Sequence, residues 1–227
     1  MRKNTYNTSF FKQWSPEMAY VLGYIFADGN VSKNDNRVRI SSIDIDILEA
    51  INILVCEQNL IRQESNMNGQ WYTLTIPSQE IQQDLMNLGV TPNKSLTCTY
   101  PQVPHQYQHD FVRGYFDGNG CVSARRHKDS AIPTISTEIA TGSECFKDGI
   151  IKALEHLTDM AHSFAVNHRK TSRTILIRAS STVSERFYNW IYYNNCICLM
   201  RKRNKYDALI AERQQNRRIK PSSAHVV

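Results

Sequence analysis

The sequence predicts an α+β fold made of two pseudo-symmetric halves, each with the element order αββαββα. Two observations carry this prediction. A short motif occurs at residues 21–31 and again at 112–122, a shift of 112 − 21 = 91 residues in a chain of 227. The helix and strand patterns around the two copies also follow one order. A shift of this length is too long for a solenoid repeat and suits a duplicated small domain. We therefore expect halves at 1–100 and 101–227.

The first half opens with a helix whose two ends are both marked. Ser15 is a good N-cap, Pro16 suits the first helical position, and Gly29 marks the end of the helix. Alternating apolar residues predict half-buried strands, and apolar residues at helical spacing predict amphipathic helices. The other elements expected in this half are a strand at 37–41, a helix at about 44–58, a strand at 71–76 and a short helix at about 78–88.

The second half repeats this order after an extended connector at 97–107, which contains Pro101 and Pro104. A final helix at about 202–214 has no counterpart in the first half. The other elements expected here are a helix at 108–118, strands at 121–126 and 134–140, a helix at 143–157, strands near 162–168 and 174–178, and a helix at 181–193.

Composition and charge limit the classes of function. Apolar residues make up 41% of the chain, enough for a core, and no apolar run approaches the roughly 18 residues of a membrane span. The polar N-terminus shows no secretory signal, so we expect an intracellular protein. The net charge of +6 lies in residues 201–220, where eight basic and two acidic residues give 8 − 2 = +6. This segment favours a phosphate-rich partner, although a solvated tail would carry the same charge.

The six cysteines show no CxxC pair and no Cys/His spacing typical of zinc sites. Cys196 and Cys198 form only a weak Cys-x-Cys signal. We expect reduced, structural thiols.

The repeated helix has features of a chemical site. Gly23 and Gly114 lie in mid-helix, where glycine costs roughly 1 kcal/mol relative to alanine. That cost is explained if the two helices touch backbone to backbone. Asp28 follows at the helix C-terminus, where a carboxylate is unfavourable unless a cation is bound. Two such helix ends side by side would build a two-metal clamp around a phosphodiester.

The segments 22–29 (Leu-Gly-Tyr-Ile-Phe-Ala-Asp-Gly) and 113–120 (Arg-Gly-Tyr-Phe-Asp-Gly-Asn-Gly) resemble the paired signature motifs of single-chain LAGLIDADG homing endonucleases. The resemblance extends over about residues 15–208. It implies antiparallel sheets that form a saddle over the major groove of double-stranded DNA, motif helices at the interface of the halves, and a monomer. It also implies Mg²⁺ as cofactor, with Ca²⁺ able to substitute without supporting cleavage.

The resemblance also assigns site residues. It places Asp28 and Asn119 at the catalytic metal-binding positions and the backbone of Ala27 and Gly118 beside the metal. The catalytic basic residues it implies are Lys94 and Lys202.

The second motif departs from the family pattern, because Asn119 stands where an acid is expected. Asparagine is nearly isosteric with aspartate but uncharged, so packing should survive while metal affinity falls. This puts double-strand cleavage in doubt and makes a nickase or an inactive nuclease the alternative outcome. Asp117, two residues earlier, should point elsewhere on the helix.

Strand alternation separates an apolar face, directed at the helices, from a polar face that would read DNA bases. Because the halves differ at most of these polar positions, we expect an asymmetric target. The expected DNA-binding residues are Arg37, Arg39, Ser41, Trp71, Thr73, Thr75, Ser123, Arg125, His127, Thr134, Ser136, Glu138 and Arg178.

The leading hypothesis is therefore a site-specific, Mg²⁺-dependent DNA endonuclease. An intron RNA maturase or a non-cleaving DNA-binding protein on the same fold is the alternative, motivated by the basic C-terminal segment. A scaffold with no role in nucleic-acid binding is a third reading.

Overall fold

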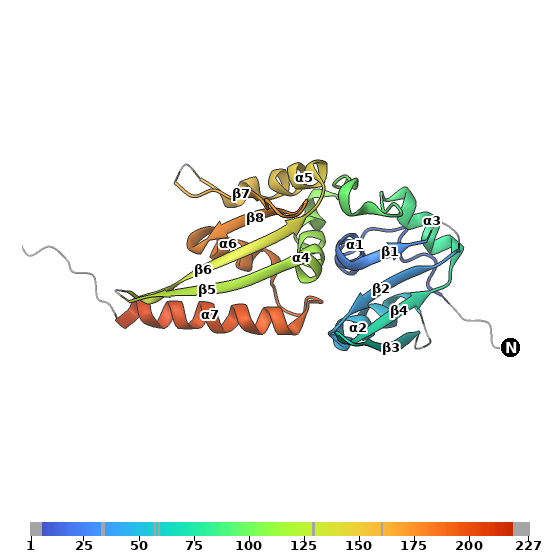
Figure 1. Ribbon diagram of the computed structural model, residues 1–227, viewed down its shortest axis with the longest axis horizontal. Coiled ribbons are helices and arrows are strands. Elements are labelled where there is room, and N and C mark those ends of the chain that lie inside the picture. Colours follow the sequence, from blue (N-terminus) through green and yellow to red (C-terminus); the bar gives the residue numbers. More distant parts are fainter. Residues whose placement is uncertain are drawn as a thin grey trace, which may run out of the picture.

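The computed structural model shows two halves side by side, with α1 and α4 adjacent at the centre (Figure 1). Each half has one antiparallel four-stranded sheet, so the predicted fold class is confirmed. The structure describes residues 6–32, 35–56, 58, 60–128, 130–159 and 161–219.

The first half has strand order β1-β2-β4-β3. A short 3-10 helix, Lys94–Leu96, follows its last α-helix. Its elements are α1 (Pro16–Asp28), β1 (Gly29–Val31), β2 (Val38–Ser42), α2 (Ile45–Val55), β3 (Ile61–Asn66), β4 (Gly69–Ile76) and α3 (Gln79–Asn87).

The second half has strand order β5-β6-β8-β7. Two 3-10 turns, His105–Tyr107 and Glu155–Leu157, flank its first two α-helices. Its elements are α4 (Gln108–Asn119), β5 (Gly120–His127), β6 (Ser130–Thr141), α5 (Glu144–Leu154), β7 (Ala165–His168), β8 (Ile175–Ser180), α6 (Ser181–Ile191) and α7 (Met200–Ile219).

Local sequence signals account for the start and end of the first motif helix. The Ser15 hydroxyl accepts a hydrogen bond from the Met18 amide at 3.1 Å, and Pro16 occupies the first turn. The helix ends at Asp28, and Gly29 enters the extended conformation of β1 without a connecting loop. Asp28 is thereby fixed at the junction of a helix and a strand.

Two strands of the first sheet and several element ends differ from the predicted ones. β1 has only three residues, and β3 exposes nearly all of its side chains, so neither shows apolar alternation. α2 ends at Val55 rather than near 58. The Asn52 side chain donates to the Gln58 carbonyl and accepts from the Leu60 amide, so it binds backbone groups beyond the end of the helix. α7 extends further at both ends than predicted, and β7 begins later.

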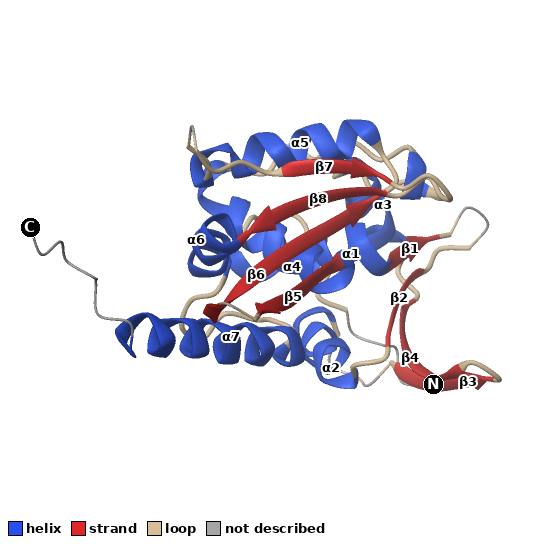
Figure 2. Cartoon of the chain, turned by 60° about the vertical axis from the view of Figure 1, so that its left-hand side comes forward, coloured by secondary structure: helices blue, strands red, loops and turns tan. Residues whose placement is uncertain are grey.

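The core lies between the sheets and the helices. In the first sheet Val38, Ile40, Leu74 and Ile76 are buried and face the helices. The alternate residues form the opposite, polar face of each sheet. Figure 2 shows the second sheet from this open face, with α4 and α6 behind it and α7 along its β5 edge.

The two motif helices touch backbone to backbone, as the paired glycines predict. A Cβ added at Gly23 would lie 2.0 Å from the Phe111 carbonyl oxygen, and one added at Gly114 would lie 2.0 Å from the Tyr20 carbonyl oxygen. Phe111 follows Tyr20 by the same 91 residues that separate the glycines. The contact is therefore reciprocal, as at a two-fold interface.

Helix α7, the element without a counterpart, is tied to the second half by its polar side chains. The Tyr206 and Thr137 hydroxyls are hydrogen-bonded, and Arg213 donates to the Pro133 carbonyl. Of the basic C-terminal segment predicted at 201–220, Lys220 lies outside the described residues. Among the described helices, none combines the length and apolar character needed to cross a membrane.

Candidate metal and nucleic-acid site

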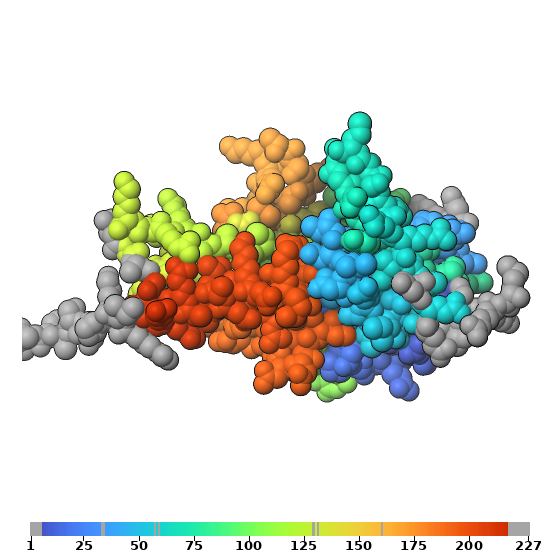
Figure 3. Space-filling view, turned by 90° about the horizontal axis from the view of Figure 1, so that it is seen from below, coloured from blue at the N-terminus to red at the C-terminus, as the bar shows by residue number. Residues whose placement is uncertain are grey.

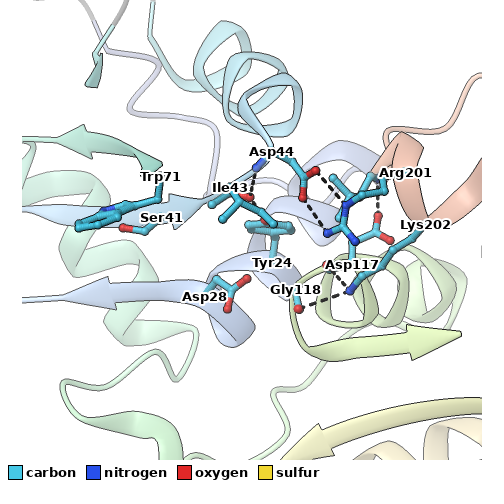
Figure 4. A pocket seen from close by; sticks show the side chains of 12 residues that line it. Tyr24, Asp28, Ser41, Ile43, Asp44, Trp71, Asp117, Gly118, Arg201 and Lys202 are labelled. Atoms are coloured by element: carbon cyan, nitrogen blue, oxygen red, sulfur yellow. Dashed lines mark hydrogen bonds and ion pairs between the residues drawn. The ribbon is translucent and has the colours of Figure 1, made fainter. Parts of the chain in front are cut away.

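The ends of α1 and α4 meet beside a cavity of about 350 Å³ (Figure 4). A Cβ added at Gly118 would lie 2.3 Å from the Ala27 Cβ and 3.1 Å from Asp28 Oδ2. Only a residue without a side chain at 118 leaves space for the carboxylate. Asp28, Gly118 and Lys202 all line this cavity, which we call the Asp28 pocket.

The Asp28 carboxylate is exposed on its pocket side. Within the described part of the chain it takes part in no hydrogen bond or salt bridge. Partial burial raises its pKa, and the positive charges of Lys202 and Lys94 oppose that rise. It is an anionic oxygen ligand at the negative end of a helix. Among the described residues, no hydrogen-bond donor of the protein occupies its oxygens.

The two predicted lysines each cap the motif helix of their own half. Lys202 Nζ donates to the carbonyls of Phe116 at 2.8 Å, Asp117 at 2.6 Å and Gly118 at 3.4 Å. Lys94 Nζ donates to the carbonyl of Gly29.

Both ammonium groups lie in crowded surroundings. Burial lowers the pKa of Lys202 to about 8 and lowers that of Lys94 as well. The carboxylates of Asp117 and Asp28 oppose the shift at Lys202. The structure places both predicted lysines at the ends of the motif helices, and their catalytic role remains a prediction.

Asn119 lines a different, smaller cavity of about 180 Å³, which we call the Asn119 pocket. Its Nδ2 donates to the Tyr115 hydroxyl at 3.4 Å, and that hydroxyl donates to the Ala140 carbonyl at 3.0 Å. Ala27 lines this pocket, as Gly118 lines the Asp28 pocket. The two cavities are thus equivalent places on the two sides of the helix pair, one lined by a carboxylate and the other by an amide.

Asp117 also lines the Asp28 pocket, but it is buried and its carboxylate is occupied by hydrogen bonds within the protein. Its carboxylate accepts from the Tyr20 hydroxyl at 2.8 Å, the Tyr192 hydroxyl at 3.0 Å and the Leu199 amide at 2.7 Å. Burial raises its pKa to about 6, although these bonds oppose the rise. Asp117 therefore fixes the loop that leads to Lys202.

A salt bridge between the halves closes one side of the Asp28 pocket. Arg201 holds both carboxylate oxygens of Asp44, at 3.0 and 2.8 Å (Figure 4). Asp44 is the N-cap residue of α2 but makes no capping hydrogen bond with its side chain. Sequence reasoning missed this pair, because no pattern links residues 157 positions apart.

The residues of the Asp28 pocket suit one divalent cation. The free carboxylate of Asp28 is a hard oxygen donor, and Mg²⁺ commonly uses one or two carboxylates together with substrate phosphates. The Asn119 pocket supplies an amide oxygen but no negative charge. No group of three or more His, Cys, Asp or Glu side chains with metal-binding geometry occurs among the described residues. The fit is therefore to a site that the substrate must complete.

The polar face of the first sheet holds most of the residues predicted there. Arg39 pairs across the strands with Thr75, and Ser41 with Thr73. Arg37 lies one residue before β2 and forms a 3.7 Å ion pair with Asp35.

Two residues predicted on this face are less available to a ligand than strand alternation implies. Thr73 is only 5% exposed, because it is central in the sheet between Ser41 and Arg62 and bonds the Ser41 hydroxyl at 3.0 Å. Trp71 donates its Nε1–H to Glu64 at 3.1 Å. Ser41 and Trp71 also line the Asp28 pocket, so the polar face of this sheet leads directly to the carboxylate.

The second sheet presents a similar face. Ser123 pairs with Ser136, Arg125 pairs with Thr134, and Glu138 pairs with Arg178.

Two details of this second face modify the prediction. Arg178 and Glu138 form a 2.7 Å ion pair. A register shift between Arg125 and His127 interrupts the alternation that placed His127 on this face, so the pattern no longer supports its assignment.

Strand β3 adds residues to the polar face that the sequence analysis did not identify. Arg62 pairs with Thr73, Glu64 with Trp71, and Asn66 with Gly69. Figure 3 shows the β3–β4 hairpin and the β5–β6 hairpin projecting on the same side of the molecule. No apolar alternation marks β3, so only its position between α2 and β4 could have indicated it.

The fold and the site together define a duplicated α+β protein whose two glycine-bearing helices meet beside a carboxylate. Residues 15–91 match the family model described as the LAGLIDADG-like domain. Residues 15–91 are thus similar to a LAGLIDADG-like domain, and the resemblance predicted from the motifs is confirmed. No curated protein matches the sequence significantly.

Solved structures of similar fold cover nearly the whole chain. The homing endonuclease I-WcaI bound to its DNA recognition sequence is 12% identical, with a TM-score of 0.55 over 87% of this chain and 90% of that chain. I-SmaMI bound to uncleaved DNA with calcium ions is 11% identical, with a TM-score of 0.58 over 92% and 95%. The N-terminal LAGLIDADG domain of DUF199/WhiA is 15% identical, with a TM-score of 0.55 over 91% and 97%. These matches establish the fold.

Proposed function

We propose that this protein binds double-stranded DNA at a long asymmetric site, as a monomer of two halves divided near residue 100, and hydrolyses a phosphodiester with Mg²⁺. One observation carries the proposal. The unpartnered Asp28 carboxylate, the buried Lys202 and the sheet-face residues Ser41 and Trp71 line one cavity. A backbone phosphate of DNA lying on the sheet would enter that cavity. The DNA-bound relatives of this fold support the choice of partner.

The residues of the pocket have distinct roles in this proposal. Asp28 would hold the cation, with the backbone at Ala27 and Gly118 beside it. When bound, such a cation would stabilise negative charge on the phosphate and favour attack by water. Lys202, whose pKa is near 8, holds charge on the phosphate or orients the attacking water. Lys94 would act in the same way for the second pocket, where Asn119 offers no charge.

The difference between the pockets predicts strand nicking rather than double-strand cleavage. Asn119 can donate an amide oxygen to a cation but cannot offset its charge. A non-cleaving DNA-binding protein is the second candidate, favoured by this same asparagine. An RNA maturase is the outcome if RNA competes better than duplex DNA.

The test begins with duplexes selected from a random library in Ca²⁺ and then cloned into a supercoiled plasmid. With Mg²⁺ we expect the natural chain to give nicked circles and Asn119→Asp to give linear DNA. Asp28→Asn should lower the nicking rate by about 100-fold or more. Asp148→Asn, the same change at a side chain 70% exposed on α5, serves as the matched control and should nick normally.

Three other results would each redirect the proposal. Tight DNA binding without any cutting by the natural chain or by Asn119→Asp would rule out the nuclease and leave DNA binding. Preferential displacement of the duplex by RNA would favour the maturase. If the chain binds neither nucleic acid at any salt concentration, the hypothesis of a scaffold without a role in nucleic-acid binding would remain.

A further inference from the structure

The loop between α6 and α7 holds two cysteines and is fixed to the second motif helix. Buried Arg113 on α4 donates to the carbonyls of Ile197 at 2.7 Å and Ile191 at 2.8 Å. The Leu199 amide donates to Asp117 at 2.7 Å. Lys202 follows three residues later, so the loop conformation sets the position of this lysine beside the Asp28 pocket.

Cys196 and Cys198 lie on this loop beside one guanidinium. Arg203 Nη1 is 3.7 Å from Cys196 Sγ and 3.9 Å from Cys198 Sγ. Cys198 Sγ donates to Met200 Sδ at 3.8 Å. Cys196 also lines a cavity of about 260 Å³ together with Arg113, so a small reagent can reach it.

The two sulfur atoms have different surroundings. Interaction with the neighbouring Cys198 thiol, together with the charges of Arg113 and Arg203, lowers the pKa of Cys196 although burial opposes this. Interaction with the neighbouring Cys196 thiol and burial raise the pKa of Cys198. Cys196 is half-buried and Cys198 is buried. An accessible thiolate beside a retained thiol is the arrangement of a reactive cysteine and its resolving partner.

We propose that Cys196 and Cys198 are a peroxide-sensitive thiol pair whose oxidation displaces the loop that leads to Lys202 on α7. Cys196 Sγ attacks a peroxide oxygen, so an S–O bond forms, the O–O bond breaks, and the departing hydroxide takes up the proton lost from Cys196. Cys198 Sγ then attacks the sulfenic sulfur, forms the S–S bond and releases water. Two thiols are oxidised by two electrons, and hydrogen peroxide is reduced to two waters.

The bridge must change the loop. A disulfide requires Cβ atoms about 3.5–4.5 Å apart. Two cysteines separated by one residue lie about 6.6 Å apart in an extended chain, so forming the bridge requires the chain to bend at Ile197. That movement breaks the Arg113–Ile197 hydrogen bond and shifts Leu199 away from Asp117. The effect on the Asp28 pocket rests on the proposed function, whereas the thiol chemistry and the loop movement do not.

The chemistry is tested on the full chain without DNA. After brief treatment with hydrogen peroxide and blocking with N-ethylmaleimide, mass spectrometry should show the Cys196–Cys198 peptide two hydrogens lighter. It should form about tenfold faster than oxidised Cys145, an exposed cysteine that serves as the internal control. Cys198→Ser should stop at a sulfenic acid on Cys196 that dimedone traps.

Arg203→Gln should slow oxidation of Cys196, while Lys205→Gln, an exposed position on the same helix, should not. Equal rates at Cys196 and Cys145, or no bridge between Cys196 and Cys198, would overturn the thiol pair.

Loop movement has its own readout. Hydrogen exchange at the Leu199 amide should accelerate on oxidation and return to its original rate with dithiothreitol. Unchanged exchange in a bridged chain would overturn the displacement.

If the chain nicks DNA, oxidation should reversibly lower the nicking rate, and the nicking rate of a Cys196→Ser/Cys198→Ser chain should not respond to peroxide. If the bridged chain nicks DNA as fast as the dithiol chain, oxidation does not control the pocket, although the thiol pair itself would still stand.

Discussion

The Asp28 pocket and the Asn119 pocket occupy equivalent places beside the motif helices but differ in charge. Tyr24 lines the first and Tyr115 the second, exactly 91 residues apart, as are Asp28 and Asn119. The glycines between the helices remain in both halves. The packing of this duplicated scaffold and the charge at its helix ends therefore vary independently. Glycine is present at the helix contact in both halves, whereas the carboxylate is present in one half only.

The largest effect is expected where the halves are most alike. Gly23→Ala and Gly114→Ala each place a methyl 2.0 Å from a backbone carbonyl oxygen, so each should destabilise the chain by about 3 kcal/mol or more. Urea denaturation of both variants measures this. The sign of the change in unfolding free energy tests the contact, because replacing glycine by alanine in an unconstrained helix stabilises it by roughly 1 kcal/mol. Stabilisation by either change would show that the helices do not touch there.

The next effect concerns Asp117, whose equivalent in the first half is the apolar Phe26. Asp117→Asn removes charged acceptors from three buried donors and should cost about 2 to 3 kcal/mol in urea unfolding at pH 7. The folded-state pKa, near 6, lies above the ordinary 3.8. The stability linked to this proton is therefore full below pH 4 and lost as pH rises through 6. Asp117→Asn should remove that pH dependence, and an unchanged profile would contradict the assignment.

A third effect separates the two helix-capping lysines. The pKa of Lys202 is near 8 in the folded chain, below its ordinary 10.5. The unfolded chain therefore binds more protons between these values, and stability should rise with pH by at most about 1.4 kcal/mol per unit there. Lys202→Met should flatten the rise measured by urea unfolding between pH 8 and 10. Lys94→Met should leave the rise in stability that is due to Lys202. If instead Lys94→Met flattens the rise and Lys202→Met does not, the rise belongs to Lys94.

The smallest effect is expected at the bridge present on one side only. Arg201 is 58% exposed, so its pair with Asp44 should contribute about 0.5 kcal/mol in a double-mutant cycle with Asp44→Ala and Arg201→Ala. Raising the salt concentration should reduce the coupling energy. A coupling that persists at high salt would mean that the pair is shielded from solvent in the folded chain.

The sequence predicted those parts of the fold that repeat or alternate. The duplicated glycines correctly indicated helices in contact, because a mid-helix glycine requires a structural reason. The strands β2, β4, β5 and β8 were placed within a residue or two, whereas β6 begins four residues earlier than predicted and β7 three residues later. β3 was missed, since an exposed polar strand at a sheet edge has no apolar face to reveal it. Boundaries such as the end of α2 depended on the side chain of Asn52, whose partners lie outside the helix.

The candidate site was predicted in part. Asp28, Lys94 and Lys202 lie at the helix ends as expected. The burial of Thr73 could not be predicted, because strand alternation shows which face a side chain lies on but not whether neighbouring strands bury it. The Asp44–Arg201 bridge and the Arg203 contact with both thiols depend on side chains brought together by the tertiary fold.

The reciprocal glycine contact has a consequence for how the chain can be divided. Helix α1 buries nine consecutive residues, 18–26, on all its faces, because α4 covers the side that its own sheet leaves open. A separated half would expose this helix to water and aggregate. Fragments cut in the connector at residues 101–104 are therefore expected to assemble only when both are synthesised together. The protein can be split for complementation, but neither fragment can be stored alone.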